Sequence, residues 1–392
     1  MEGNRIVAKD DDYLPLSKFE EYSQHELRSN DVIVATVGSH PTQPGSVVGR
    51  TARISHEFSG SFLNQNAVCL RINRPDLINQ RFLFYLSRTI LFKHHIESRA
   101  RGSANQVRMA IGELKKFTVD YPPLEDQKKI AAILSAYDDL IENNRRRIVL
   151  LEQMAENLYR EWFVRMRFPG YQTAKFVKGV PVGWNYKSIG ELCEFISRGP
   201  SIDYVDDADG IPVLNQKCIR NGEIELESVK CARELSDEKS LLYLRDHDVL
   251  INSMGEGTLG RVSRNLSVSS RMIIHNCITV LRVKRDAYSQ LLLYYNLASM
   301  QNYLVLLGQG STGQTSLKET LIKKIKIAAP PKILWQEFNK FVEPIWQELA
   351  TIKQQNLTLV STRELLLPRL ISGKLPVENL DIMFPPSMED AA

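Results

Sequence analysis

Residues 124–168 of this chain read LEDQKKIAAILSAYDDLIENNRRRIVLLEQMAENLYREWFVRMRF, a stretch without a single glycine or proline. Apolar side chains recur along it in alternating steps of three and four, the spacing of a helix that packs along one seam. The spacing predicts one long helix, and at about 1.5 Å per residue this helix would span about 60 Å. Its predicted seam positions are Ile130, Ile133, Tyr137, Leu140, Asn144 and Leu151.

A second stretch with the same pattern lies near the C-terminus and stops at Pro368 and Gly373. Each seam contains one asparagine, which costs stability there but can fix the register and orientation of two paired helices. We therefore expect the two helices to pair antiparallel. An alternative stays open, in which each helix packs elsewhere and this face is solvated. The seam positions predicted for the second helix are Ile345, Leu349, Ile352, Asn356 and Leu359.

Each helix forms the end of one copy of an internal repeat that covers most of the chain. Such a repeat indicates the architecture of a chain more directly than a short motif does. The offset between the copies drifts slowly, as small loop insertions would produce. The matching segments are 27–33 (LRSNDVI) with 244–250 (LRDHDVL), 48–50 (VGR) with 259–261 (LGR), 102–106 (GSANQ) with 310–314 (GSTGQ), Pro122-Pro123 with Pro330-Pro331, and Gln127 with Gln336.

The part of each copy that precedes the helix is rich in predicted strands. Short β-branched runs such as residues 32–34 (VIV) and 278–280 (ITV) are separated by Gly, Asn and Pro turns. We expect an α+β fold in which two mixed α/β domains are separated by two long antiparallel coiled-coil helices, related by a pseudo-two-fold repeat. The expected divisions are a first domain at 1–122, a helical spacer at 123–168, a second domain at 169–329, a second helical spacer at 330–375 and a flexible tail at 376–392.

The composition excludes several classes of protein. With 43% hydrophobic and 24% charged residues, and a net charge of +4 over 392 residues, the chain is neither disordered nor strongly basic. No run of about 18 apolar residues could span a membrane, and no apolar N-terminal segment resembles a signal peptide. The five cysteines show no paired spacing, so we expect free thiols in a reducing cytoplasm and no zinc site.

Several short segments resemble the specificity subunit of type I restriction-modification systems. They are residues 121–131 (YPPLEDQKKIA), 141–144 (IENN), 150–152 (LLE), 180–184 (VPVGW) and 367–375 (LPRLISGKL). The resemblance implies two target-recognition domains, each of which reads one half of a bipartite site in double-stranded DNA. It also implies two methyltransferase subunits docked on the helices, and restriction and translocase subunits beyond them. S-adenosylmethionine, ATP and magnesium are then expected only in those partners, and this chain is expected to have no catalytic residue, metal or cofactor.

The two copies differ in where they begin. The second opens at Gly183-Trp184, sixty residues before Leu244, whereas the first opens at Met1, twenty-six residues before Leu27. We therefore expect the first recognition domain to lack its opening thirty or so residues and to leave a strand edge unpaired.

Candidate DNA-binding residues lie at matching places in the two copies. Arginine can pair with guanine and amide side chains with adenine, whereas lysine and serine mostly hold phosphate. For each group of candidates the alternative is that the charged residues only form a solvent-exposed face and do not contact DNA. The candidates are Arg50, Arg53, Arg99, Arg101, Ser103, Asn105, Gln106 and Arg108 in the first copy, and Arg261, Arg264, Gln309, Ser311, Thr312, Gln314 and Lys318 in the second.

Two other functions find less support. Residues 308–313 (GQGSTG) match the glycine pattern of a nucleotide-cofactor loop, but no acidic residue follows about twenty positions later, where residues 328–331 (AAPP) stand. A coiled-coil scaffold that reads no DNA sequence would explain the helices but not the duplicated strand-rich domains. The sequence therefore favours a DNA-reading subunit.

Overall fold

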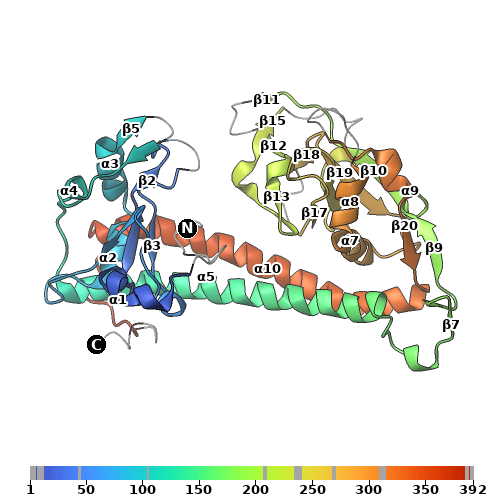
Figure 1. Ribbon diagram of the computed structural model, residues 1–392, viewed down its shortest axis with the longest axis horizontal. Coiled ribbons are helices and arrows are strands. Elements are labelled where there is room, and N and C mark those ends of the chain that lie inside the picture. Colours follow the sequence, from blue (N-terminus) through green and yellow to red (C-terminus); the bar gives the residue numbers. More distant parts are fainter. Residues whose placement is uncertain are drawn as a thin grey trace. The chain divides into compact units, whose positions relative to one another are not determined.

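The computed structural model describes residue 6 and residues 13–42, 46–103, 106–205, 210–233, 241–266, 271–308, 315–384 and 388. The chain divides into two compact units. The first contains residues 1–143 and 356–392, and the second contains residues 144–355. Each unit therefore combines a strand-rich domain with part of both long helices, and the predicted α+β architecture is confirmed (Figure 1).

The first unit is built on a three-stranded antiparallel sheet in the order β3, β1, β4. Helix α2 contacts β1 and β3. A smaller sheet joins β2 to the hairpin of β5 and β6. The elements are β1 (Val32–Ala35), β2 (Val37–Gly38), β3 (Thr51–Arg53), β4 (Ala67–Leu70), α2 (Gln80–Leu86), α3 (Ile90–Arg99), β5 (Arg101–Ser103), β6 (Gln106–Arg108) and α4 (Ile111–Leu114).

The second unit repeats this plan and enlarges it. Its main antiparallel sheet has the order β10, β19, β16, β17, and a second sheet has the order β11, β15, β12, β18. The sheet strands are β10 (Cys193–Arg198), β11 (Tyr204–Val205), β12 (Ile211–Leu214), β15 (Lys230–Ala232), β16 (Val249–Asn252), β17 (Val262–Arg264), β18 (Ile273–Ile274) and β19 (Ile278–Val283). Around them lie β9 (Asn185–Ser188), α6 (Ile189–Leu192), β13 (Ile219–Arg220), β14 (Glu223–Ile224), α7 (Gln290–Ser299), α8 (Gln301–Leu307), α9 (Glu319–Lys324) and β20 (Lys326–Ala329).

The repeated turn before β1 and β16 shows why residues 27–33 and 244–250 match. Asn30 and His247 both adopt left-handed backbone conformations, with φ of 68° and 65°. The next residue is an aspartate in each copy, and its carboxylate accepts the N–H of the residue three positions earlier, at 2.7 Å for Asp31 and 2.8 Å for Asp248. The side chain of Asp31 or Asp248 thus closes the turn that leads into the central strand.

The long helices begin immediately after the two proline pairs. α5 covers Leu124–Tyr159 and continues as a π-helical turn over Arg160–Val164, and α10 covers Lys332–Ile371. Proline fits just before a helix because the first turn has no use for its missing N–H. Gly373, with φ of 71°, follows the end of α10 as a left-handed C-terminal cap.

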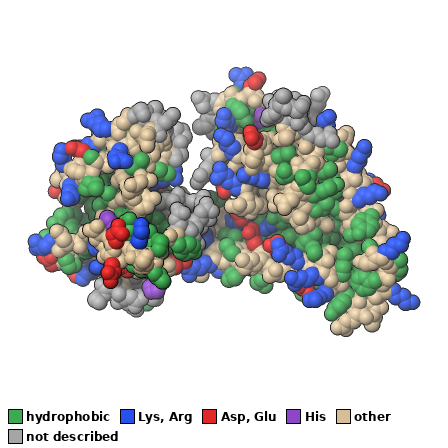
Figure 2. Space-filling view, in the orientation of Figure 1, with side chains coloured by type: hydrophobic (Ala, Val, Ile, Leu, Met, Phe, Trp, Pro, Cys, Tyr) green, Lys and Arg blue, Asp and Glu red, His purple; other side chains and the backbone are tan. Residues whose placement is uncertain are grey.

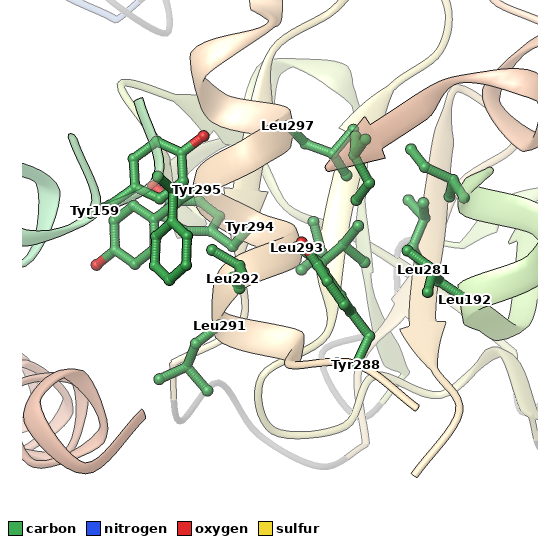
Figure 3. Packing of buried hydrophobic residues seen from close by; sticks show 14 of the residues in the cluster. Tyr159, Leu192, Leu281, Tyr288, Leu291, Leu292, Leu293, Tyr294, Tyr295 and Leu297 are labelled. Carbon is green, nitrogen blue, oxygen red and sulfur yellow. The ribbon is translucent and has the colours of Figure 1, made fainter. Parts of the chain in front are cut away.

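Within each unit the two helices pack antiparallel, because the start of one shares a buried cluster with the end of the other. In the first unit Ile130 and Leu134 share a cluster with Leu367 and Leu370. In the second unit Tyr159 shares a cluster with Phe338 and other α10 residues. Figure 3 shows Tyr159 next to Tyr294 and Tyr295 of α7, and its ring stacks on Tyr295 with centroids 5.5 Å apart.

Alternate seam positions on α5 lie one residue later than expected. Leu140 does not lie in a buried seam, since 52% of its surface is exposed, and its neighbour Ile141 is buried instead. Ile130, Asn144, Leu349 and Ile352 are buried, and Ile133, Tyr137, Leu151, Ile345, Asn356 and Leu359 are half-buried. Leu140 and Ile141 are adjacent and both apolar, so an average spacing of 3.5 residues does not decide which of the two is buried.

Candidate nucleic-acid interface

Two loops lie together in the first unit, at the end of the unit away from α5 (Figure 1). β2, which follows the central strand β1, pairs with β6, so that Val37 lies opposite Arg108. The N–H of Met109 then donates to the carbonyl of Thr36 at 2.8 Å. The β5–β6 hairpin is therefore fixed to the loop that leaves the main sheet, and this contact positions the backbone of the candidates Arg101, Gln106 and Arg108.

Alternation along the hairpin decides which side chains face outward. Val107 is fully buried, whereas its neighbours Gln106 and Arg108 are exposed. Arg101, which lies opposite Arg108, is exposed as well. Side chains on a strand alternate between faces, so the buried valine anchors the hairpin and turns these polar groups to solvent.

Gly102 allows the hairpin to form. Its φ is 144°, and a Cβ at this position would lie 2.3 Å from the carbonyl oxygen of Gln106. No side chain fits there without moving the opposite strand. The backbone of Ser103 belongs to β5, but its side chain and the whole of Asn105 lie outside the described residues.

A hollow of about 400 Å³ lies beside the hairpin, lined by Arg99, Arg101, Arg108, Ala110 and Glu113. Arg99 lies 3.6 Å from the carboxylate of Glu113, and Lys116 donates to the same carboxylate at 2.6 Å. The hydrogen bond from Lys116, with the nearby charges of Arg99 and Arg101, lowers the pKa of Glu113. The structure therefore brings together three of the arginines that the sequence singled out.

The second unit repeats the contacts that anchor these loops. Met254, which follows β16, forms an isolated bridge with Ser316, and the N–H of Leu317 donates to the carbonyl of Ser253 at 2.9 Å. These are the counterparts of the contacts that fix the first hairpin. Lys318 is exposed just before α9, whereas the predicted contacts Gln309, Ser311, Thr312 and Gln314 lie outside the described residues.

The prediction for Arg264 is wrong, because its side chain is buried within the second unit. Its guanidinium lies 4.5 Å from the ring of Tyr294 and 4.6 Å from that of Trp346, and donates to Glu152 of α5 at 3.2 Å. Only 6% of the residue is exposed. Such a group cannot reach DNA, and a sequence does not distinguish a buried, paired arginine from an exposed one.

Three further arginines predicted at matching places in the two copies, Arg50, Arg53 and Arg261, are partly engaged by the protein. Arg261 donates to the carbonyls of Ile219 and Gly257 at 3.1 and 2.9 Å. Arg53 donates to the side-chain oxygen of Asn30 at 3.2 Å, and Arg50 is half-buried. These contacts hold loops in place, so the four arginines do not form two matching exposed patches.

A group that the sequence reading missed lies on the second sheet of the second unit. Tyr204 of β11 stacks on His275 with ring centroids 5.6 Å apart, and the ammonium of Lys230 lies 4.5 Å above the tyrosine ring. Figure 2 shows Lys and Arg side chains gathered on the side of this unit that carries β13, where Lys217 and Arg220 are exposed. Only the fold brings these strands together, since the charges are scattered along the sequence.

Other chemistry is sparse in the part of the chain that the structure describes. No group of three or more His, Cys, Asp or Glu side chains is placed to hold a metal ion there. The cysteines are free, and burial raises the pKa of Cys193 to about 12 and that of Cys277 to about 11, which disfavours thiolate chemistry. Among the described helices none is long and apolar enough to cross a membrane.

Comparison with known proteins points to one family. The model of the type I restriction modification DNA specificity domain matches twice, at residues 15–153 and 181–359. The MjaIX specificity subunit of a type I restriction enzyme from Methanocaldococcus jannaschii is 28% identical over 78% of this chain and 71% of its own length. The HindI specificity subunit from Haemophilus influenzae is 24% identical over 89% of this chain and 87% of its own.

A solved structure has the same fold. The crystal structure of the type I restriction-modification S subunit from M. genitalium aligns with a TM-score of 0.53 and 16% sequence identity, over 92% of this chain and 86% of that one. The two matched segments of the family model coincide with the internal repeat read from the sequence.

Proposed function

We propose a DNA-reading function for this chain, which belongs to the type I restriction-modification DNA specificity family. In this proposal it is the specificity subunit that reads a bipartite site and directs methyltransferase and restriction subunits to it. It contributes no catalytic group of its own, and S-adenosylmethionine, ATP and magnesium act in those partners. Its place of action is the cytoplasm, where the host DNA lies.

The observation that carries the proposal is the repeated pair of loops. In each unit a backbone hydrogen bond joins the segment after the central strand to the segment before the last short helix. It runs from Met109 to Thr36 at 2.8 Å in the first unit and from Leu317 to Ser253 at 2.9 Å in the second. Two units with the same anchored loops suit a DNA site that consists of two half-sites. A scaffold that only holds partners would have no use for this duplication.

The long helices would then act as the spacer between the two readers. We assign residues 1–122 and 169–329 to reading, residues 123–168 and 330–375 to the spacer, and residues 376–392 to the tail. Each unit has exposed apolar side chains on its part of the helices, Leu357 and Leu365 in the first and Leu150 and Met154 in the second, and each set offers a docking surface for a methyltransferase subunit.

The direct test is a binding selection with the chain purified together with its methyltransferase subunits. A library of duplexes with two randomised half-sites and a spacer of variable length is expected to yield one bipartite sequence. That sequence should bind about a thousandfold more tightly than random duplex. Equal affinity for all duplexes would contradict the proposal and favour a scaffold. Methylation-aware sequencing of host DNA, with and without the gene, should reveal the same site.

The spacer assignment has its own test. One heptad inserted into each helix, after Asn144 in α5 and before Asn356 in α10, lengthens the pair by about 10 Å, or about three base pairs of 3.4 Å. The selected spacer should lengthen while the half-site bases stay the same. An unchanged spacer would show that the helices do not set the distance.

A further inference from the structure

Arg101 and Arg108 face each other directly across the β5–β6 hairpin. Residues in this relation on an antiparallel pair lie on one face with Cβ atoms about 5 Å apart, and like charges there destabilise the pairing. Both side chains are exposed and both line the same hollow, together with Arg99 from the end of α3. The hairpin thus concentrates positive charge at one point although the chain as a whole is nearly neutral.

The carboxylate nearest to this point is already engaged. Glu113 accepts a hydrogen bond from Lys116 at 2.6 Å and lies 3.6 Å from Arg99. One carboxylate, that of Glu113, therefore stands among four cations, and its single negative charge offsets their repulsion only in part. An anion between the two guanidinium groups would remove the repulsion and satisfy their donors together.

We propose that Arg101 and Arg108 form a clamp for a single phosphate group, and that in the complex this is a backbone phosphate of the DNA. The inference rests on the proposed function and narrows it. Guanidinium groups bind phosphate through two parallel N–H···O bonds, and two opposed guanidinium groups can hold one phosphate from both sides. Arg101 then fixes the position of the DNA and does not read a base, since phosphate contacts carry no sequence information.

In this proposal the two ends of the hairpin have different roles, phosphate binding at its base and contact with bases near its tip. Gln106 lies on the same face as Arg108, two residues and therefore about 7 Å nearer the tip. A phosphate held at the base of the hairpin would set this amide at a fixed distance from the backbone, where it can meet base edges. The clamp belongs to the first unit, because the repeat places Gln309 and Ser316, both uncharged, where Arg101 and Arg108 stand.

The first test needs no DNA. Inorganic phosphate is titrated into the full chain and into Arg101→Gln, Arg108→Gln and the matched control Lys93→Gln, an exposed charge on α3 outside the hollow. Either arginine substitution should weaken phosphate binding about tenfold or more, the worth of one charge-assisted hydrogen bond. Without phosphate, the two variants should melt at the same temperature or higher, because the repulsion is relieved. Unchanged phosphate binding, or a lower melting temperature without phosphate, would overturn the clamp.

The second test separates this inference from the proposed function. With the selected bipartite duplex, each arginine variant should lose affinity equally for all base variants of the site. The slope of log affinity against log salt should fall by about one. A loss of affinity that depends on the identity of one base pair would mean that the arginine reads a base. This result would refute the clamp and leave the DNA-reading function intact. Phosphate binding without any sequence-selective DNA binding would retain the clamp and refute the function.

Discussion

The two units use the same turn but fix their sheets to the helices with different charges. In the second unit the buried Arg264 of β17 donates to Glu152 of α5 and lies against the rings of Tyr294 and Trp346. Its repeat counterpart in the first unit, Arg53 of β3, is half-buried and donates to Asn30. The ion pairs at the helices of the first unit come from other elements. Arg88, which follows α2, lies 3.9 Å from Asp138 of α5 and pairs with Glu364 of α10, and Arg363 of α10 pairs with Asp138 and Glu364.

The comparison separates what the repeat preserves from what each unit has acquired. The turn aspartates and the strand arrangement are common to both because the central strand needs them. The contact between a sheet and the helices depends on side chains at the interface, and these differ. Equivalent positions should therefore respond differently to the same substitution.

The largest difference is expected at Arg264 and Arg53. Arg264→Ala removes the hydrogen-bonded partner of the partly buried Glu152, which keeps only Lys353 at 3.6 Å. It also opens space beside Tyr294 and Trp346, so the second unit should lose about 3–5 kcal/mol of unfolding free energy. Arg53→Ala removes one half-exposed hydrogen bond and should cost about 1 kcal/mol. Hydrogen exchange of α7 peptides, compared with α2 peptides, assigns each loss to its unit. Equal losses would mean that burial of the guanidinium does not matter.

The turn aspartates should differ by a smaller amount. Asp248 and its partner Arg282 are both nearly inaccessible, with side chains 2% and 8% exposed, whereas 38% of the Arg71 side chain that pairs with Asp31 is exposed. Asp248→Asn should therefore cost about 3 kcal/mol. Asp31→Asn should cost about 1–2 kcal/mol, since water already screens that pair. Chemical denaturation followed by hydrogen exchange measures both.

The Asp31 contribution should also depend on pH. Burial raises the pKa of Asp31, but hydrogen bonds from Arg71 and from the N–H of Arg28 outweigh it and leave the pKa below its ordinary value of 3.8. Its stabilisation is thus present above pH 3.8 and is lost as the pH falls through the lowered pKa. The gap in stability between the wild type and Asp31→Asn should be constant near neutral pH and narrow in acid. A gap that widens in acid would contradict this assignment.

A smaller effect distinguishes the predicted seam from the observed one. Ile141 is 2% exposed and Leu140 is 52% exposed. Ile141→Ala should cost about 2–3 kcal/mol, whereas Leu140→Ala should stay within about 0.5 kcal/mol. Thermal unfolding of the two single variants tests this directly, and the reverse order would restore the seam as the sequence predicts it.

This pair of residues shows how far the sequence could predict the fold. The long helices, the two strand-rich domains and their repeat follow from the run without glycine and from matching segments, and they are confirmed. Which of two adjacent apolar residues faces the core depends on the partner surface, and no periodicity contains that information. The sequence also could not predict the ion pairs of each unit. Arg88, Asp138 and Arg363, for example, are far apart in the chain and meet only after folding.

The candidate interface was predictable in part. Glycine and polar residues at equivalent places pointed to the β5–β6 hairpin, which the structure holds against β2. The sequence could not separate Arg101, which is exposed, from Arg264, which is enclosed by Tyr294 and Trp346, since both follow the same local pattern of charge. Tyr204 of β11 stacks on His275, which follows β18 and lies 71 positions later in the chain, so no local pattern could reveal the contact.

The smallest contrast concerns two glutamines that the repeat makes equivalent, Gln127 of α5 and Gln336 of α10. Gln127 is fully buried, accepts the N–H of Asn79 at 2.9 Å, and donates to the carbonyls of Leu77 and Pro122 at 2.9 and 2.8 Å. Gln336 is exposed and lines a cavity of about 620 Å³ beside the start of α10.

Gln127→Ala should therefore lower the unfolding free energy by about 1–2 kcal/mol, because it leaves buried backbone groups without partners. Gln336→Ala should change it by no more than about 0.5 kcal/mol. Hydrogen exchange at the start of α2 should rise only in the first variant, since the freed N–H of Asn79 precedes that helix. Equal costs would contradict this contrast and would mean that Gln336 contributes as much to the start of α10 as Gln127 does to the start of α5.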